Sequence, residues 1–226
     1  MTRQQVCERI ETLGIIPAIR VTCAEDALFA AESVTRGGIP IVEVTMTVPG
    51  ALDVVAELLR TQPDLIVGAG TVLTAQTAQQ CVDAGVHFLT SPGLHMPVME
   101  VAAKDNIVVM PGALTPTEIC AASQAGASFV KVYPCAAVGG PSYIRSMRGP
   151  FPEVSLVAAG GVNQHTASDY ILAGATALGI GGDLIPRAAI QERNRDWIHE
   201  LTHRFLGMVK TARTKRQNSN HPVPVA

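Results

Sequence analysis

Charged residues are scarce in this chain of 226 residues, where they make up 16% of the total, against about 25% in a typical soluble domain. The formal net charge is only -2, which gives no electrostatic case for a nucleic-acid partner, since binding a phosphate backbone needs clustered Lys and Arg. No stretch reaches the ~18 consecutive apolar residues of a membrane-spanning helix, and the N-terminus has no apolar signal segment. We therefore expect no nucleic-acid partner and no membrane partner, and a chain with 47% hydrophobic residues can bury a large core.

Cysteine pairs of the CxxC type are also missing. The chain has five cysteines, an odd number, so we expect neither a disulfide framework nor a zinc site. His87, His95 and His165 are scattered, and each is expected to be a surface or loop residue rather than a metal ligand. We expect a protein of the reducing cytoplasm that contains no metal.

Short apolar segments recur along the chain at intervals of 20 to 27 residues. This spacing fits a strand, a loop and a helix of about three turns, and near-continuous apolar runs are typical of strands buried on both faces. Eight such units predict an α/β fold, a closed (β/α)8 TIM barrel. The alternative is an open doubly wound sheet, but no GxGxxG segment opens a first helix. The segments begin at Ile16, Pro40, Leu65, His87, Ile107, Ser128, Ser155 and Ala177.

Helix-start patterns lie between these segments. Capping boxes, in which a Thr side chain and a Glu three residues later satisfy each other's backbone N–H groups, are expected at two of them. Glycines shortly after several of the intervening segments indicate where those helices end. The candidate first residues are Thr22 and Thr115 for the capping boxes, and Thr47, Thr74 and Asn163 for simpler caps.

The eight units leave only the two ends of the chain outside the barrel. We expect one domain over residues 1–210, with an extra N-terminal helix over residues 3–13 and a longer helix over residues 193–211. Residues 211–226 are polar, with a small basic cluster and two prolines. That composition predicts a disordered tail in which the basic residues are solvated.

Lys131 is the first candidate for chemistry. The active site of such a barrel lies at the carboxyl ends of the strands, and Lys131 alone of the four lysines sits inside an apolar segment, FVKVYP. Burial disfavours the charged ammonium, and a neutral amine can attack a ketone to form a Schiff base. Glu43 is the only carboxylate inside any expected strand, and it is a candidate proton shuttle. A purely structural Lys–Glu pair would produce the same contact.

Other polar residues and glycines follow the expected strands. Arg20 ends the first segment, where a guanidinium can grip a carboxylate with two hydrogen bonds. Thr71 follows the sequence GAG, whose glycines allow the backbone to approach a ligand. Glycine pairs end the last two segments, at 160–161 and 181–182, where barrels commonly bind phosphate through backbone N–H groups.

In these segments the chain resembles a known family. The class I aldolases that cleave 2-keto-3-deoxy-6-phosphogluconate (KDPG), together with the 4-hydroxy-2-oxoglutarate (KHG) aldolases, have similar segments in the same order and spacing. The resemblance covers roughly residues 10–190. It is carried by VEVTMTVPGAL, IVGAGTV, LTSPG, MPG, FVKVYP, GPFP, AGGVN and IGGDL.

The resemblance implies a role for individual positions. Lys131 matches the Schiff-base lysine, and Glu43 matches the general acid/base. Thr71 matches the threonine near the pyruvate carboxylate, and Pro92 matches the proline beside the bound keto acid. Tyr133 stands where the family often has a Phe close to the lysine. The backbone on the phosphate side is implied at three glycines: Gly160, Gly161 and Gly182.

Three positions depart from the usual family pattern. Thr47 stands where an Arg often binds the carboxylate, and Arg20 is the expected substitute. Ala159 replaces a Thr whose hydroxyl bears on the choice of stereoisomer. Asp183 stands where a Ser often faces the phosphate, and a carboxylate there would repel a phosphate unless it caps the following helix.

The implied activity is reversible aldol cleavage through an imine on Lys131, with Glu43 moving the protons. KDPG would give pyruvate and glyceraldehyde 3-phosphate, and KHG would give pyruvate and glyoxylate. The imine takes the place of a metal, so no cofactor is expected, and the family's usual assembly is a homotrimer. Two alternatives remain: a sugar-phosphate isomerase or epimerase on the same barrel, and a non-catalytic barrel that binds a keto acid or phosphosugar.

Overall fold

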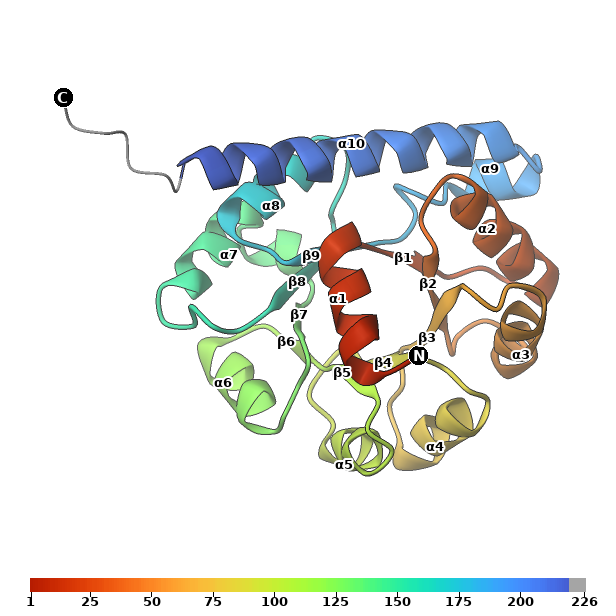
Figure 1. Ribbon diagram of the computed structural model, residues 1–226, viewed down its shortest axis with the longest axis horizontal. Helices are drawn as coiled ribbons and strands as arrows, with labels where there is room; N and C mark the ends of the chain where they lie inside the picture. Colours follow the sequence, from red (N-terminus) through yellow and green to blue (C-terminus); the bar gives the residue numbers. More distant parts are fainter. Residues whose placement is uncertain (220–226) are drawn as a thin grey trace.

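The apolar segments form parallel strands around one barrel (Figure 1) in the computed structural model, which describes residues 1–219. Nearly every strand residue is buried, as expected for strands covered on both faces. Within the described residues the strands are β1 (Ile15–Ile19), β2 (Ile41–Thr45), β3 (Ile66–Gly70), β4 (Phe88–Thr90), β5 (Val108–Met110), β6 (Gly112–Ala113), β7 (Val130–Val132), β8 (Leu156–Ala159) and β9 (Ala177–Ile180).

The strands β5 and β6 are two halves of the expected fifth strand. They are separated by Pro111, which has no N–H to donate to a neighbouring strand. The hydrogen-bonded order runs β5-β4-β3-β2-β1-β9-β8-β7-β6, so β5 pairs with β4 and β6 pairs with β7. The chain itself joins the two ends of this order and closes the ring. The predicted (β/α)8 barrel is confirmed, and the open doubly wound sheet is wrong.

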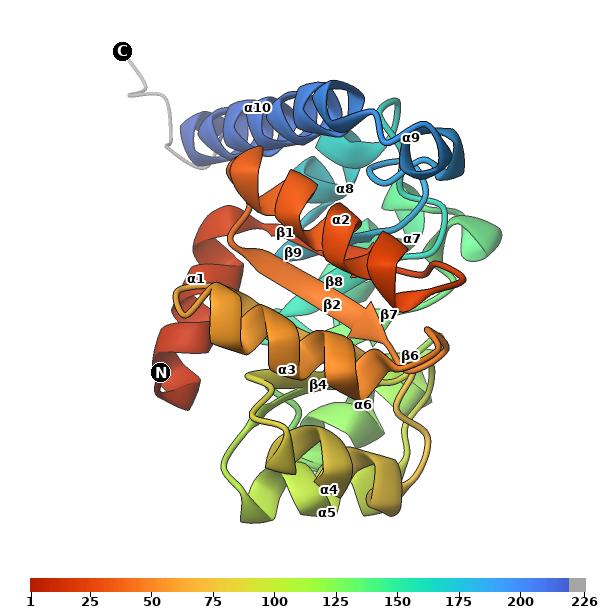
Figure 2. The same ribbon diagram turned by 90° about the vertical axis from the view of Figure 1, so that its right-hand side faces the viewer.

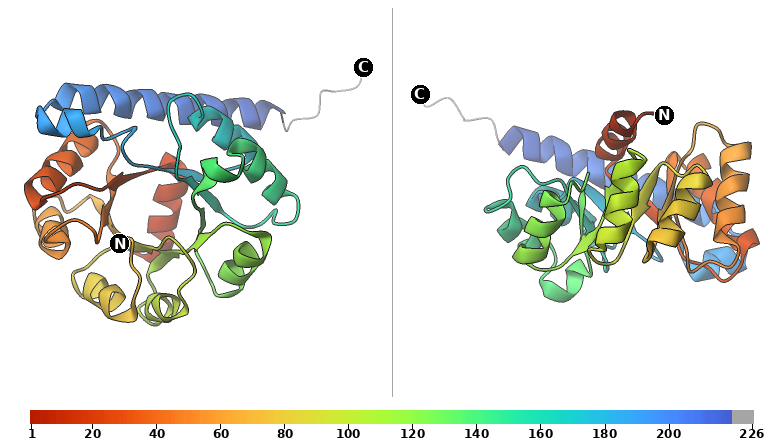
Figure 3. Two further views of the ribbon diagram at one scale, coloured as in Figure 1. Left: turned by 180° about the vertical axis from the view of Figure 1, so that it is seen from behind. Right: turned by 90° about the horizontal axis from the view of Figure 1, so that it is seen from below.

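Helices surround the ring of strands (Figures 1 and 2), and α1 crosses one end of the barrel, behind the strands in the reverse view of Figure 3. The N-terminal helix has the predicted bounds. In the described residues the helices are α1 (Arg3–Leu13), α2 (Ala24–Arg36), α3 (Ala51–Thr61), α4 (Ala75–Asp83), α5 (Met96–Lys104), α6 (Pro116–Gln124), α7 (Pro141–Arg148), α8 (Ala167–Ala173), α9 (Arg187–Gln191) and α10 (Arg195–Ser219), with the 3-10 turn η1 (Cys135–Val138).

Two of the predicted caps are confirmed. Thr115 begins α6 with a complete capping box, and the Thr74 side chain accepts a hydrogen bond from a backbone N–H at the start of α4. A further capping box at Thr2 begins α1 and was not anticipated. These caps satisfy N–H groups that the first turn of a helix leaves without partners.

The other three predicted caps are wrong. The N-cap of α2 is Cys23, not Thr22, and its side chain makes no capping hydrogen bond. The N-cap of α3 is a glycine, so the Thr47 side chain does not cap this helix. It accepts a hydrogen bond from Arg20 instead. Thr166 is the N-cap of α8, while the Asn163 side chain accepts a hydrogen bond from a backbone N–H within the preceding loop.

The C-terminal helix is longer than predicted. The expected disordered tail is wrong over residues 211–219, because α10 continues to Ser219 and packs along α8 and α2 (Figure 1). Val209 and Ala212 are almost fully buried on the inner side of this helix. Their burial stabilises helical turns that the polar composition alone did not indicate. The expected tail over residues 220–226 lies outside the described residues.

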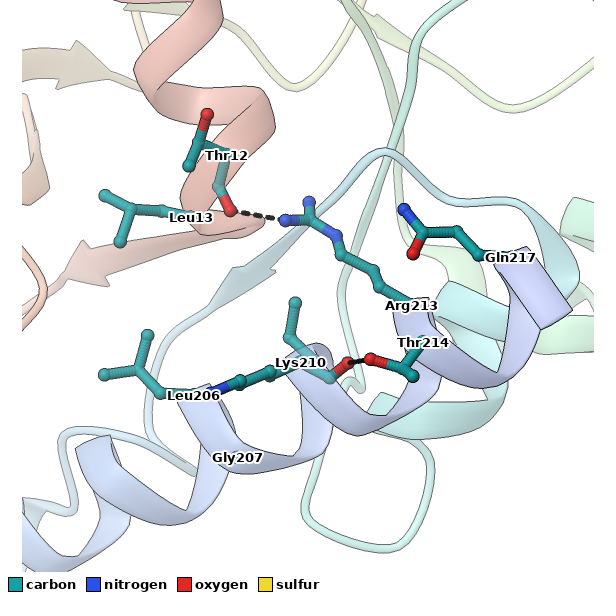
Figure 4. Close-up of a pocket in the computed structure, with 9 residues that line it drawn as sticks. Thr12, Leu13, Leu206, Gly207, Lys210, Arg213, Thr214 and Gln217 are labelled. Atoms are coloured by element: carbon teal, nitrogen blue, oxygen red, sulfur yellow. Dashed lines mark hydrogen bonds between the residues drawn. The ribbon is translucent and has the colours of Figure 1, made fainter.

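Arg213 anchors this part of α10 to the N-terminal helix. Its guanidinium donates a hydrogen bond to the backbone carbonyl of Thr12 at the end of α1 (Figure 4). It also donates to the carbonyl of Glu11, and to that of Thr176 at 2.9 Å. A helix C-terminus carries carbonyls without partners and a partial negative charge, so a cation is stabilising there. The prediction that the basic cluster is wholly solvated is therefore wrong for Arg213.

Candidate active site

A cavity of about 230 Å³ opens at the carboxyl ends of the barrel strands. It lies at the end of the barrel opposite the one that α1 covers, where barrels of this class place their chemistry. Eight of the ten candidate residues line it, and a ninth, Thr71, accepts a hydrogen bond from the lining residue Arg20. The lining residues are Ala18, Arg20, Glu43, Lys131, Tyr133, Ala159, Gly160, Gly161, Val162, Gly179, Gly181, Gly182 and Asp183.

Lys131 and Glu43 meet inside this cavity. They lie on β7 and β2, which are four strands apart in the ring, and their side chains approach across the barrel interior. Lys131 Nζ is 3.7 Å from Glu43 Oε1, and the two side chains are 14% and 5% exposed. The predicted proximity of the amine and the carboxylate is present, and both groups face the space that a ligand would enter.

Gly70 makes the position of the Glu43 carboxylate possible. A Cβ atom on Gly70 would lie 2.0 Å from Glu43 Oε1, far inside van der Waals contact. Gly68 has a similar function, because a Cβ atom there would lie 2.1 Å from the Phe88 ring. The GAG sequence was interpreted as backbone that approaches a ligand, but these two glycines make room for the protein's own side chains.

Thr90 is the second polar neighbour of Lys131, and sequence analysis did not select it. Its Oγ1 lies 3.4 Å from Lys131 Nζ, and the residue is 1% exposed at the end of β4. In the sequence, the only signal for Thr90 was a hydroxyl near the carboxyl end of a short apolar segment. Because threonine is common in strands, that signal is weak without the fold.

Arg20 lies at the mouth of the cavity within a group of threonines. Its guanidinium donates to Thr71 Oγ1 at 3.1 Å and to Thr47 Oγ1 at 3.3 Å. Thr47 in turn lies 2.8 Å from the buried hydroxyl of Thr45. Thr71 has a φ of 58°, a strained conformation for a β-branched residue that is most often found at functional sites. The structure therefore brings Arg20 and Thr71 together as predicted.

Tyr133 and Pro92 differ in their relation to the cavity. Tyr133 lines it, with the Lys131 amine 5.7 Å from the centroid of its ring. Pro92 is exposed, and it does not line the cavity. Its carbonyl instead packs against Gly112, where a Cβ atom would lie 2.1 Å from the carbonyl oxygen. Pro92 thus fixes the turn after β4, directly beyond Thr90.

The glycines near the predicted phosphate site have different reasons to be glycine. Gly160 and Gly161 both have positive φ, and a Cβ atom on either would come within 3 Å of η1 or the residue before it. Gly182 has open space in place of a Cβ atom, and its φ is not in the left-handed region. Protein packing therefore explains the first two, whereas Gly182 leaves room beside the cavity.

Asp183 lines the cavity next to Gly182 and is exposed. The N-cap of the following helix, α9, is Pro186, and no side chain caps that helix. Within residues 1–219 the Asp183 carboxylate forms no hydrogen bond and no ion pair. The arrangement that would have turned this charge away from a bound phosphate is therefore not present.

Metal ligation and the two buried thiols do not offer another centre for the chemistry in residues 1–219. The described part of the chain has no cluster of three or more His, Cys, Asp or Glu side chains that could hold a metal ion, and all five cysteines are free. Burial raises the pKa of Cys81 to about 11 and that of Cys135 to about 11. A thiol with such a pKa is not a nucleophile at neutral pH.

No helix in residues 1–219 is long and apolar enough to cross a membrane.

Comparison with known proteins gives one consistent result. The KDPG and KHG aldolase family pattern matches residues 6–201. The 2-dehydro-3-deoxy-phosphogluconate aldolase of Haemophilus influenzae is 31% identical over 92% of this chain and 99% of its own length. The KHG/KDPG aldolase of Escherichia coli is 34% identical over 86% of this chain and 92% of its own length.

A solved structure agrees with these relatives. It is the KDPG aldolase of Legionella pneumophila, with pyruvate captured at low pH as a covalent carbinolamine intermediate. It is 32% identical to this chain, superposes with a TM-score of 0.81, and covers 87% of this chain and 95% of its own. This chain is therefore similar over almost its whole length to proteins that share one chemistry.

Proposed function

This chain belongs to the KDPG and KHG aldolase family, and we propose that Lys131 is the amine through which it acts as a class I aldolase. The reaction is the reversible cleavage of KDPG to pyruvate and glyceraldehyde 3-phosphate, and KHG is a second substrate that would give pyruvate and glyoxylate. The observation that carries the assignment to Lys131 is its buried pairing with Glu43, 3.7 Å away, at a cavity on the carboxyl end of the barrel.

The first step forms a covalent bond between enzyme and substrate. The lone pair of the Lys131 nitrogen attacks the C2 ketone, and the ketone oxygen takes up a proton to give a carbinolamine. Loss of that hydroxyl as water, with a proton supplied by Glu43, leaves a protonated imine. Glu43 is suited to supply it because its carboxyl group is close to the nitrogen and almost fully buried.

The second step breaks the carbon–carbon bond. The Glu43 carboxylate, directly or through a water molecule, removes the proton of the C4 hydroxyl. The C3–C4 electron pair then moves toward the imine nitrogen, and the aldehyde leaves. The cationic nitrogen accepts the electrons and the product on Lys131 is a neutral enamine. Glu43 then returns the proton to C3, and hydrolysis of the new imine releases pyruvate and the free amine.

The residues around the pair suggest how the substrate is held. Arg20 and Thr71, joined by a hydrogen bond at the cavity mouth, would bind the C1 carboxylate. Tyr133 would pack against the keto acid beside Lys131, whereas Pro92 lies outside the cavity, in the turn after β4. Backbone groups would bind the distal phosphate, at Gly160, Gly161 and Gly182.

Asp183 would influence which group is bound at the distal end of the substrate. Its carboxylate faces the same part of the cavity as Gly182 and has no partner in the described residues, so it opposes a second negative charge there. We therefore expect phosphate to contribute less to binding here than the glycine backbone alone would allow.

We propose a homotrimer of the reducing cytoplasm as the working form of this enzyme. Five free thiols support the compartment, since disulfides form in oxidising environments. The trimer rests on the family resemblance and can be tested by light scattering on the purified protein.

Covalent trapping tests the proposed function directly. The protein is incubated with pyruvate and borohydride, and the adduct is located by peptide mass spectrometry. We expect one adduct on Lys131 in the unaltered protein, and none on that peptide in Lys131→Ala with loss of KDPG cleavage. Lys104→Ala is a matched control, because Lys104 is an exposed lysine on α5.

Each other outcome contradicts a different part of the proposal. A folded protein that turns over a sugar phosphate without forming an adduct would be an isomerase or epimerase. A protein that binds pyruvate without an adduct or turnover would be a binding barrel. Unfolding of Lys131→Ala, with activity retained by the fraction that stays folded, would show that the Lys–Glu pair is purely structural.

A further inference from the structure

The hydroxyl of Thr90 has one partner among the described residues, and that partner is the reactive amine. Thr90 Oγ1 lies 3.4 Å from Lys131 Nζ. The residue is 1% exposed, so this hydroxyl is not hydrated by bulk water. Burying a hydroxyl costs free energy unless a hydrogen bond compensates it, and a valine of the same shape would avoid that cost. The position is therefore better explained by a function of the hydroxyl than by packing.

The main chain holds Thr90 firmly in place. Its carbonyl accepts a hydrogen bond from the Val72 N–H at 3.0 Å, and it is paired with Met110 across the ladder between β4 and β5. A β-branched side chain on such a strand has few rotamers. The hydroxyl is thus a fixed point on the barrel wall, whereas the four-carbon stem of Lys131 is flexible.

The two polar neighbours together determine where the amine's lone pair points. A neutral amine nitrogen has one bond to carbon, two N–H groups and one lone pair, in a tetrahedral arrangement. Thr90 Oγ1 at 3.4 Å and Glu43 Oε1 at 3.7 Å are both placed to accept the N–H groups. The fourth direction, which carries the lone pair, is then left for the cavity. The hydrogen bond to Thr90 and the longer ion-pair contact with Glu43 are expected to tighten when the substrate binds.

We propose that Thr90 is a positioning residue that orients the Lys131 nitrogen for attack on the substrate ketone. This inference rests on the proposed function, because it concerns the same imine. Thr90 acts through the amine and need not touch the substrate. A hydroxyl suits this role because it can accept a hydrogen bond from the N–H of an ammonium, a neutral amine or a protonated imine. It therefore serves each state of Lys131 without adding a charge beside Glu43.

The rate of imine formation tests this role. Thr90→Val keeps the shape of the side chain and removes the hydroxyl, Thr90→Ala removes it together with a methyl group, and Thr90→Ser keeps the hydroxyl. Each protein is mixed with saturating pyruvate, quenched with borohydride at increasing times, and the adduct on Lys131 is measured. We expect trapping to be about tenfold slower or more in the Val and Ala variants, and within about threefold of the unaltered rate in the Ser variant. The pyruvate KM should change little, because Thr90 orients the amine and does not bind the keto acid.

A matched control separates this role from general destabilisation. Thr202→Val makes the same chemical change at an equally buried threonine on α10, where the hydroxyl bonds only to the backbone of its own helix. It should leave the trapping rate unchanged. Thermal melting of all the variants shows whether each one is folded.

The possible failures can be told apart. Absence of any adduct in the unaltered protein would overturn the proposed function and this inference with it. An unaltered protein that forms the adduct, beside a folded Thr90→Val or Thr90→Ala that forms it equally fast, would overturn this inference alone. Slow trapping in Thr90→Ser, as slow as in the Val variant, would also overturn it, since the hydroxyl would then not be the cause.

Discussion

Gly70→Ala should disable the site by moving one carboxylate. The backbone of Gly70 is not in the left-handed region, so an alanine can adopt its conformation without strain. The new Cβ atom, however, would lie 2.0 Å from Glu43 Oε1 and 2.5 Å from Glu43 Cδ. The substitution therefore acts on Glu43 while leaving every catalytic side chain in the protein.

The size of the effect follows from these distances. Ordinary contact begins at about 3.4 Å, so the carboxylate must move by at least about 1.4 Å. Misplacement of a reacting group by about 1 Å can cost about 100-fold in rate, and we expect kcat for KDPG cleavage to fall by about that factor. Overpacking a barrel core should also lower the free energy of unfolding by about 1–3 kcal/mol. For a chain of this size, each kcal/mol lowers the melting temperature by about 2–4 °C.

The assay compares Gly70→Ala with Gly207→Ala. Gly207 is an exposed glycine on α10 with no atom near its missing Cβ, so its substitution should preserve activity and slightly raise the melting temperature. Aldehyde release is followed in a coupled assay, and melting is followed by circular dichroism. A folded Gly70→Ala protein that keeps its kcat within about twofold would refute the reasoning, because the placement of Glu43 would then not limit the reaction.

Three further predictions concern the cavity mouth, its distal end and the thiols. Arg20→Met should raise the pyruvate KM in the trapping reaction by about 10-fold to 100-fold, because a charged hydrogen bond to the carboxylate is lost; an unchanged KM would assign the carboxylate to another group. Asp183→Ser should lower the KM for KDPG by about fivefold and leave that for the unphosphorylated sugar acid unchanged, since one repulsive charge contributes about 1 kcal/mol; equal effects on both substrates would contradict this. At pH 8 a disulfide-exchange reagent should modify the exposed Cys23 and spare Cys81 and Cys135, whose pKa values burial raises to about 11 from 9.0. Because the unfolded chain loses these two thiol protons first, the free energy of unfolding should decrease as pH rises from about 9 toward 11, which urea melts at pH 8 and pH 10 would measure.

The sequence was sufficient to predict the architecture and the proximity of Lys131 and Glu43. Strand and helix units of regular length left the barrel as the best arrangement, and a charge inside an apolar strand is unusual enough to select Lys131 and Glu43. Both inferences use local patterns whose physical meaning does not depend on distant residues.

What remained unpredicted depends on contacts between distant segments. Thr90 looks like any strand threonine until β7 is placed opposite it. Gly70 looks like ligand-binding backbone until the Glu43 carboxylate is seen beside it. The last turns of α10 are polar in sequence, and their helix is stabilised by the hydrogen bonds of Arg213 to the end of α1. In each case the determining partner lies many residues away, so no local pattern could indicate it.

The interruption of the strand at Pro111 lies beside Lys131 in the barrel wall. The Pro111 carbonyl accepts the Lys131 backbone N–H at 2.9 Å, and Gly112 is paired with Lys131 in the ladder. The same segment contacts the turn that contains Pro92, because Gly112 leaves room for the Pro92 carbonyl. One short segment therefore supports both the strand that carries Lys131 and the turn beside the opening. A side chain introduced at Gly112 should disturb both at once.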